Sequence, residues 1–488
     1  MEAPFNNPSI SARKPPYLPI SSYPSLLHSP YFHSDVETSP VSTTSLISLS
    51  SATPSLYLSV ERDATSPASF PEELEREKKR DVAEALIVEN LFDYSAWDSL
   101  LTLPHTNKLY ERILEVFPTC PRYWQLYAEF EIRNGQIMNA RSIYKRSVTA
   151  CGDVALWKSY IKFIFHTGSL YEIIQGLEDA IAKIGMDHRS YIFWKEVLLL
   201  RIKMYNTEII KRESTQGLLN DPLRQSSTGA SLLPTLMEQE WFGQLLPHSD
   251  IPLYKQYAEI SQMRLFYHEW LSTATENMSL PWTAYCHFEM IVGSNSALAK
   301  KLISEYELHY TAAKETFIEL VRIYENLDTS LPAIPLTKQN VNSLKSLQVQ
   351  WKAILDYEKA NPLQLSVFPL QKRIQFCYQN CLLNCAYHAD VWCDYFQFLL
   401  SHKQSIKALD ILRIAIDRFL LDDELLKLII CHFLEENHQI EAVKEVYQSM
   451  LSIKPTAVAS ADTTLHATSG FGSPIVILNY LAFLRRIY

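Results

Sequence analysis

Three cysteines and a histidine in the last third of the chain have the residue types of a metal site. Cys377, Cys381 and Cys385 are spaced four residues apart, and His388 follows them. Zn²⁺ binds thiolates and imidazoles, but its sites usually take cysteine pairs from two elements that converge on a tetrahedron. On a helix, a spacing of four places all three thiols on one face, where cysteine packs as a small apolar residue. The pattern favours buried helix contacts, with a cap or solvent role for His388, and an enzyme or metal protein centred on these cysteines is the alternative.

Other motifs of catalysis are missing from the sequence. The chain has no Gly-x4-Gly-Lys stretch that would cradle phosphate and no Gly-x-Ser-x-Gly elbow. We therefore expect no enzyme activity, no cofactor and no catalytic residue.

Composition indicates a helical, acidic protein. Only 11 of 488 residues are glycine, whereas 47% are hydrophobic. Sheet folds need glycine in their hairpin turns, so the low glycine content favours helices. The net charge of −9 argues against RNA as the main ligand, because phosphate contact depends on Lys and Arg; a local basic patch stays open. Eight scattered cysteines without a signal-like N-terminus indicate reduced thiols, hence cytosol or nucleus.

The first 72 residues differ in kind from the rest. They are rich in Ser, Thr and Pro and lack helical periodicity, so they cannot bury enough apolar area to offset the entropy of ordering. We expect a disordered tail over residues 1–72, with Ser-Pro dipeptides that are either kinase sites or simply typical of disorder. The following stretch, Glu75 to Asp81, holds four basic residues among acidic ones and predicts a solvated first helix turn, or a weak nuclear import signal.

From about residue 82 the chain repeats a block of aromatic residues. The clearest copy is Trp124-x2-Tyr127-x2-Phe130-Glu131, and the block returns with a period in the thirties, which is typical of helix-pair solenoids. We expect one weak copy between Trp282 and Trp351. The other copies are Trp157-x2-Tyr160-x2-Phe163, Trp194-x2-Val197, Trp282-x2-Tyr285-x2-Phe288-Glu289, Trp351-x2-Ile354-x2-Tyr357-Glu358 and Trp392-x2-Tyr395-x2-Phe398, with weaker ones at Trp97, Tyr254-x2-Tyr257, Leu428-x2-Cys431-x2-Leu434-Glu435 and Ile477-x2-Tyr480-x2-Phe483.

A second helix is predicted after each block. In the clearest copy Ala140, Ile143, Tyr144 and Val148 share one face. The small Ala140 would let paired helices approach, and Tyr144 and Ile143 would lie beside Trp124. The same pattern returns at Ala408, Ile411, Leu412 and Ala415, and at Ala442, Val446 and Tyr447.

These patterns predict an all-α superhelix of stacked helix pairs, because one pair cannot bury its aromatic stripe alone. The glutamate after the third aromatic is expected to bond across to a neighbouring helix. The predicted repeat core consists of Trp124, Tyr127, Phe130, Glu131, Tyr144, Trp157, Tyr160, Phe163, Trp194, Trp282, Tyr285, Phe288, Glu289, Trp351, Tyr357, Glu358, Trp392, Tyr395 and Phe398.

The paired blocks resemble HAT (half-a-TPR) repeats, which are found in RNA-processing assemblies. Three longer stretches, Ile181 to Leu198, Ala297 to Pro335 and Trp351 to Leu399, resemble the suppressor-of-forked family. That family comprises the large HAT subunit of cleavage stimulation factor and its fungal Rna-fourteen relatives. The resemblance covers roughly residues 85–488.

The resemblance implies a scaffold in nuclear pre-mRNA cleavage and polyadenylation, and a HAT scaffold of splicing or ribosomal RNA processing is the alternative. It implies contacts with cleavage and polyadenylation factors, including the RNA-binding subunit of cleavage stimulation factor, and with RNA only indirectly or weakly. It also implies N-terminal repeats over 82–210, a linker over 211–241, and C-terminal repeats over 242–488 that carry homodimerisation. Tyr488 ends within a half repeat, without the further repeats and the Pro-rich tail of the family, so the expectation is either a truncated sequence or a shortened paralogue.

Overall fold

The structure is a computed structural model that describes residues 70–202, 259–292 and 296–487, apart from residues 326, 328, 330 and 453–472. Most of the predicted tail, the predicted linker over 211–241 and the weak copy at Tyr254 and Tyr257 lie outside these residues. The described residues form helices and no strand, which confirms the all-α class. None of these helices is long and apolar enough to cross a bilayer.

The helices differ in length, and most of the repeat helices have 10 to 15 residues. A further helix covers residues 191–202. In chain order the others are α1 (Phe70–Glu89), α2 (Tyr94–Leu101), α3 (Asn107–Val116), α4 (Pro121–Arg133), α5 (Ile137–Ala150), α6 (Val154–Thr167), α7 (Leu170–Ile184), α9 (Ile260–Leu271), α10 (Ser279–Val292), α11 (Ala297–Tyr324), α12 (Val341–Lys359), α13 (Val367–Asn384), α14 (Ala389–Ser401), α15 (Ser405–Ile414), the π-helix η4 (Ala415–Phe419), α16 (Glu424–Glu436), α17 (Ile440–Ser452) and α18 (Pro474–Ile487).

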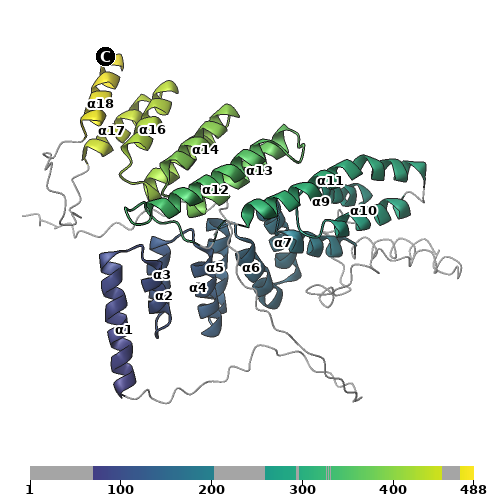
Figure 1. The fold of residues 1–488 in the computed structure, drawn as a ribbon, viewed down its shortest axis with the longest axis horizontal. Helices are drawn as coiled ribbons and strands as arrows, with labels where there is room; N and C mark the ends of the chain where they lie inside the picture. Colours follow the sequence, from purple (N-terminus) through teal and green to yellow (C-terminus); the bar gives the residue numbers. More distant parts are fainter. Residues whose placement is uncertain are drawn as a thin grey trace, which may run out of the picture.

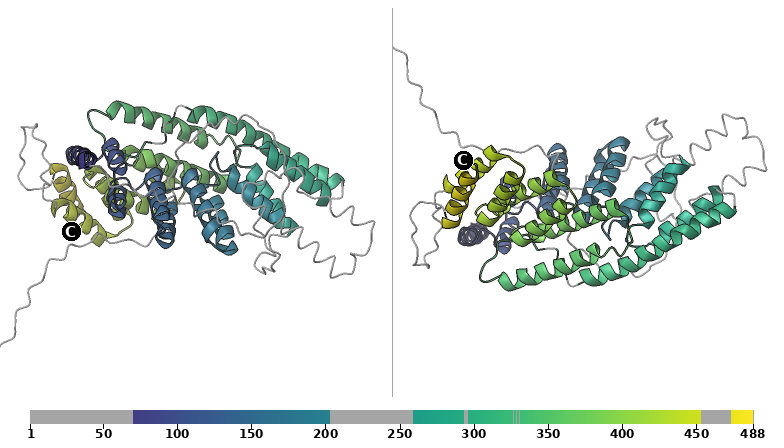
Figure 2. Two further views of the ribbon diagram at one scale, coloured as in Figure 1. Left: turned by 90° about the horizontal axis from the view of Figure 1, so that it is seen from below. Right: turned by 90° about the horizontal axis from the view of Figure 1, so that it is seen from above.

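The helix pairs stack into a superhelix that doubles back on itself. In Figure 1 the helices α1 to α7 form one row, the chain turns at α9 to α11, and α12 to α18 return above the first row. Figure 2 shows the long helices α11 and α12 along one side of the molecule. We call the row α1–α7 the first arc and the row α12–α18 the second arc.

Local sequence decides where the repeat helices begin. Asp93, Asp153 and Asp423 are N-caps whose carboxylates accept backbone N–H groups of the first turn of α2, α6 and α16. Ser169 and Glu172 form a capping box at the start of α7. These contacts satisfy donors that a helix start leaves unpaired.

The weak copy predicted between Trp282 and Trp351 is wrong. A single helix of 28 residues, α11, occupies the middle of that interval, and α12 extends for 19 residues around Trp351. Leu344 and Leu347, two and one turns before Trp351, are buried. The long α11 pairs with α10, and α12 pairs with α13, so the interval contains no additional repeat.

The second helices bury the face that the sequence predicts, with one correction. Ala140, Ile143, Tyr144 and Val148 of α5 are all buried. Ala408, Ile411, Leu412 and Ala415 are buried as well. In α17, however, Ala442 is only half-buried, whereas Val443 is fully buried and Tyr447 lies one turn after it. Val443, not Ala442, therefore occupies the position that Ala140 has in α5.

The apolar core divides in a different place from the predicted linker. One cluster of buried side chains runs from Ala83 to Leu320 and also includes Leu363 and Phe376, whereas the second runs from Leu327 to Phe483. The division between the two cores therefore falls between α11 and α12. The domain boundaries at 82–210 and 242–488 remain predictions.

Candidate functional site

Three of the tryptophans close the turn that precedes their own helix. Each stands four residues after the N-cap of its helix and donates from Nε1 to the backbone carbonyl six residues earlier. The pairs are Trp97 with Leu91 (2.9 Å), Trp124 with Pro118 (2.9 Å) and Trp392 with Ala386 (2.8 Å). We call this contact the indole clasp. It joins the buried ring to the loop between repeats, so burial and loop geometry are fixed together.

A lysine replaces tryptophan in the clasp of α16. Lys427 stands four residues after the N-cap Asp423, is buried, and donates from Nζ to the Leu421 carbonyl. The repeat spacing predicts Leu428 at the tryptophan position, and this prediction is wrong. Aromatic spacing alone cannot find this position, whereas counting four residues from the capping aspartate does.

In several blocks the second and third aromatics hold a tyrosine from the preceding second helix. At five junctions one tyrosine ring lies between a tyrosine and a phenylalanine of the next repeat, with centroid distances of 4.8 to 5.7 Å. We call this contact the tyrosine clamp. Its members are Tyr110 with Tyr127 and Phe130, Tyr144 with Tyr160 and Phe163, Tyr267 with Tyr285 and Phe288, Tyr378 with Tyr395 and Phe398, and Tyr447 with Tyr480 and Phe483.

The clamp explains why the block has its particular composition. Tyr144 was expected beside Trp124 of its own repeat, but its clamp contacts reach forward to α6. The face of Trp124 is covered by the Arg146 guanidinium, 5.1 Å from the ring centroid. The second-helix pattern includes Tyr447 but does not single out the other clamp tyrosines, Tyr110, Tyr267 and Tyr378. Only in α5 does a small residue, Ala140, precede the clamp tyrosine by one turn, so no uniform sequence signal marks the clamp.

The block glutamates bond to neighbouring helices, as the sequence pattern predicts. Glu131 accepts from Asn139 of α5 at 3.0 Å, Glu289 holds Arg264 of α9 at 2.5 and 2.8 Å, and Glu358 holds Arg373 of α13 at 2.6 and 2.8 Å. The last pair is buried on both sides, and removing one partner of such a pair costs about 3–5 kcal/mol.

Arginine also links consecutive second helices. Arg146 of α5 binds Glu111 of α3 through both guanidinium nitrogens, at 2.9 and 3.1 Å, and Tyr127 donates to the same carboxylate. These hydrogen bonds hold the pKa of Glu111 below its ordinary value. Arg112, Glu84 and Trp97 repeat the arrangement one repeat earlier.

The remaining predicted core residues lie in the same stack but vary in burial. Trp157, Trp194 and Trp351 are buried. Trp194 stacks on Trp270 of α9 and donates to the Gly185 carbonyl at 3.0 Å. Trp282 is half-buried and stacks on Tyr310, with ring centroids 4.8 Å apart. Phe130, Tyr160, Tyr357 and Phe398 are half-buried.

The cysteine row lies within the helix packing. Cys377, Cys381 and Cys385 are buried, and burial raises the pKa of Cys377 and Cys381 well above the ordinary thiol value. The thiols are therefore protonated in this environment, whereas zinc binds thiolates. No group of three or more potential ligands is close enough for a metal within the described residues. His388 is the N-cap of α14 without a side-chain cap bond, and burial lowers its pKa.

The two arcs meet through specific contacts. Thr119 donates to the Leu383 carbonyl at 3.4 Å, and Arg373 donates to the Met186 carbonyl at 3.3 Å. The rings of Phe92 and Tyr387 meet edge to face at 5.5 Å. The doubled-back arrangement is thus held by side chains far apart in the sequence.

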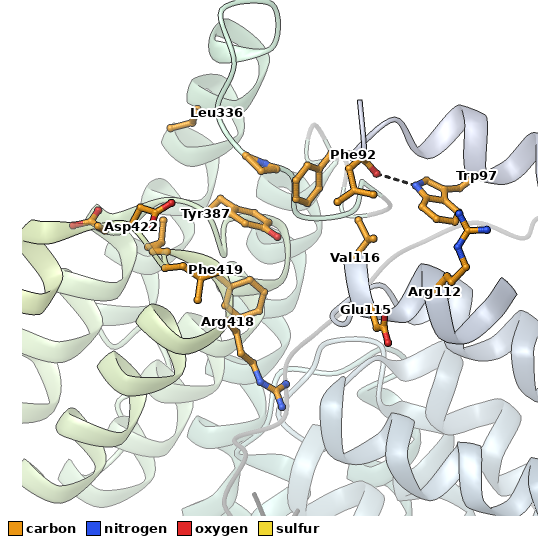
Figure 3. A pocket seen from close by; sticks show the side chains of 15 residues that line it. Phe92, Trp97, Arg112, Glu115, Val116, Leu336, Tyr387, Arg418, Phe419 and Asp422 are labelled. Carbon is orange, nitrogen blue, oxygen red and sulfur yellow. Dashed lines mark hydrogen bonds between the residues drawn. The ribbon is translucent and has the colours of Figure 1, made fainter. Parts of the chain in front are cut away.

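A cleft of about 770 Å³ opens at this junction. Figure 3 shows Phe92 and Val116 from the first arc facing Leu336, Tyr387 and Phe419 from the second. Its walls are largely apolar and aromatic, which is typical of surfaces that bind peptides or small molecules.

The fold and the repeated aromatic contacts define a HAT-type helical superhelix. Residues 242–488 match the family model described as Suppressor of forked protein, and residues 82–219 match the PRP39 N-terminal HAT repeat. The chain belongs to the suppressor of forked family.

Named relatives agree with this assignment. The chain is 26% identical over 386 residues to cleavage stimulation factor subunit 77 of Arabidopsis thaliana, covering 78% of this chain and 43% of that protein. It is 26% identical over 322 residues to protein suppressor of forked of Drosophila melanogaster, covering 63% of this chain and 36% of that protein. It is 21% identical over 397 residues to mRNA 3'-end-processing protein rna14 of Schizosaccharomyces pombe, covering 78% and 48%.

The chain spans less than half the length of these three relatives. Among solved structures, the crystal structure of CstF-77 aligns with a TM-score of 0.39 at 13% identity, covering 68% of this chain and 65% of that one.

Proposed function

We propose that this chain is a non-enzymatic scaffold of mRNA 3'-end processing that acts in the nucleus during pre-mRNA cleavage and polyadenylation. The match of residues 242–488 to the suppressor of forked family carries the proposal. Clasps and clamps use the aromatic blocks for contacts between repeats, so the outer helix faces are left for partners.

The proposed partners are cleavage and polyadenylation factors, including the RNA-binding subunit of cleavage stimulation factor. Binding rests on protein contact, since the chain has a net charge of −9 and phosphate contact needs basic residues. RNA is then held indirectly or weakly.

An RNase-treated affinity purification of the tagged full chain from nuclear extract tests this function. We expect cleavage and polyadenylation factors to remain bound after the RNA is digested. Loss of all of them on RNase treatment, or recovery of spliceosomal proteins alone, would contradict the proposal.

Homodimerisation through residues 242–488 is part of the proposal. Sedimentation velocity of the full chain should give a dimer, and cross-linking of mixed isotope-labelled chains should join residues 242–488 of the two copies. A monomer at micromolar concentration, or inter-chain cross-links confined to residues 82–210, would count against it.

The second candidate is a HAT scaffold of splicing or ribosomal RNA processing. The observation in its favour is that residues 82–219 match the PRP39 repeat model. The same purification decides between the two candidates through the set of proteins recovered.

A further inference from the structure

The cleft between the arcs is bordered by three exposed leucines from three separate elements. Leu91 follows α1, Leu336 precedes α12 and Leu421 precedes α16, and they are 48%, 46% and 56% exposed. All three side chains line a single cleft with aromatic walls. Exposed apolar side chains that gather in this way are typical of an occupied binding surface.

The charges of the cleft favour a cationic occupant. The two arginines of the cleft already have interactions within the chain. Arg112 donates to both carboxylate oxygens of Glu84 at 2.9 and 3.0 Å, and Arg418 also interacts with another group of the protein. Glu115 and Asp422 also line the cleft, and neither has an ion pair among the salt bridges of the described part of the chain. An occupant with Lys or Arg would supply the missing counter-charges.

One segment of this chain has the complementary composition. Residues 13–20 read Arg-Lys-Pro-Pro-Tyr-Leu-Pro-Ile and lie outside the described residues. Arg62 is the other basic residue of the first 69, and it stands between Glu61 and Asp63. Prolines restrict their neighbours to extended conformations, and aromatic grooves bind such segments at low entropic cost.

Chain length allows the segment to reach the cleft. The cleft lies at the C-terminal end of α1, next to Leu91 and Phe92. A helix of 20 residues is about 30 Å long. The chain before α1 must therefore cover about 30 Å between the start of α1 and the cleft at its C-terminal end. About 50 residues separate Ile20 from Phe70, and each can span roughly 3.3 Å.

We propose that residues 13–20 bind in the cleft between the two arcs of the same chain. Tyr17 and Leu18 pack against Phe92, Tyr387 and the exposed leucines, while Arg13 and Lys14 pair with Glu115 and Asp422. Tethering makes the contact intramolecular, so a weak intrinsic affinity is sufficient for occupancy.

Site-specific photo-cross-linking in the full chain tests the proposal. Tyr17 is replaced by benzoylphenylalanine, the protein is irradiated at low concentration, and the products are mapped by mass spectrometry. We expect intramolecular cross-links to Leu336, Tyr387 or Leu421. Cross-links elsewhere, or only between two chains, would overturn the proposal.

Matched variants test the apolar and charged contacts separately. Leu421→Glu should lower the yield of these cross-links about tenfold, the loss expected when roughly 1.4 kcal/mol of contact is removed. Leu425→Glu makes the same change in the neighbouring helix, at a side chain that is 68% exposed and outside the cleft, and should leave the yield unchanged. Equal effects of the two would refute a docking role for Leu421.

Reversing the charges on both sides of the contact tests whether the ion pairs hold the segment in the cleft. Arg13→Glu with Lys14→Glu should reduce cross-linking, and adding Glu115→Lys with Asp422→Lys should restore it. All four residues are altered in the last protein, so restored yield reports complementarity and not folding. Failure of the rescue, with an unchanged thermal unfolding curve, would overturn the charge pairing.

Discussion

At the scale of single residues, three tryptophans both fill the core and hydrogen-bond to the loop before their helix. The indole N–H of Trp97, Trp124 and Trp392 reaches a carbonyl of the preceding turn. Trp157 occupies the same place after Asp153, but its buried Nε1 has no hydrogen-bond partner in the structure. The chain therefore contains a natural comparison between a tryptophan with the clasp and one without it.

Replacing Trp392 by Phe should destabilise the protein more than replacing Trp157 by Phe. Both changes remove similar volume, but only the first leaves the buried carbonyl of Ala386 without its donor, which costs about 1–2 kcal/mol more. Urea unfolding of the two variants measures the difference. Equal losses of unfolding free energy would show that the clasp adds nothing to stability.

His268 should make stability depend on pH in the mildly acidic range. Burial, aided by Arg264 and His309 and opposed by Glu289, lowers the pKa of His268 to about 4 from 6.5, and its ring stacks on Tyr306 at 3.5 Å. The unfolded chain thus binds a proton between pH 6.5 and about 4 that the folded chain does not. Stability falls as the pH drops through this window.

His268→Gln should flatten that part of the profile, since an amide does not titrate. Urea midpoints from pH 7.5 to 4 for the two proteins provide the measurement. His432 is exposed, so His432→Gln is the matched control and should keep the slope. Parallel profiles for all three proteins would refute the role of His268.

At the scale of helices, the tyrosine clamp couples one repeat to the next. A tyrosine of one repeat contacts two rings of the following helix, and each aromatic pair contributes about 0.5–1.5 kcal/mol beyond its buried area. The clamp is therefore a directional link, because its members belong to different repeats.

Tyr378→Leu should loosen α14 while leaving α4 unchanged. The substitution keeps an apolar side chain but removes the contacts with Tyr395 and Phe398. Hydrogen–deuterium exchange should therefore accelerate in α14. The reciprocal variant Tyr110→Leu should accelerate exchange in α4 and not in α14, and uniform acceleration by either variant would contradict a local link.

At the scale of the whole molecule, the doubled-back shape depends on a few contacts between the arcs. Phe92 and Tyr387 meet edge to face, and Thr119 and Arg373 donate to carbonyls of the opposite arc. The most closely packed helix pairs lie within the arcs, so the contact between the two rings is what their double replacement removes from the junction.

Replacing Phe92 and Tyr387 together by Ala should open the junction. We expect a larger radius of gyration in small-angle X-ray scattering with little loss of helical circular dichroism. Phe396→Ala is the control, because that ring contacts Phe433 within the second arc. The control should lower the unfolding temperature without enlarging the molecule, and an unchanged radius in the double variant would contradict the prediction.

The sequence determined the helix pairs and the faces they bury, because aromatic residues at helical spacing must share one stripe. It predicted the partners of Glu131, Glu289 and Glu358 only as neighbouring helices. It misplaced the block of α16 and divided the long repeat around α11, since residue type alone does not show where a cap begins a helix or where a helix continues.

Only the tertiary structure decided which rings meet across repeats and where the two arcs touch. Thr119 and Leu383 are separated by 264 residues, and small rotations at every intervening repeat add up to place them together. Periodicity determines which face each helix buries. The accumulated curvature of the stack determines which distant helices come into contact. For that reason the buried helix faces could be predicted from the sequence, but the clamp partners and the cleft between the arcs could not.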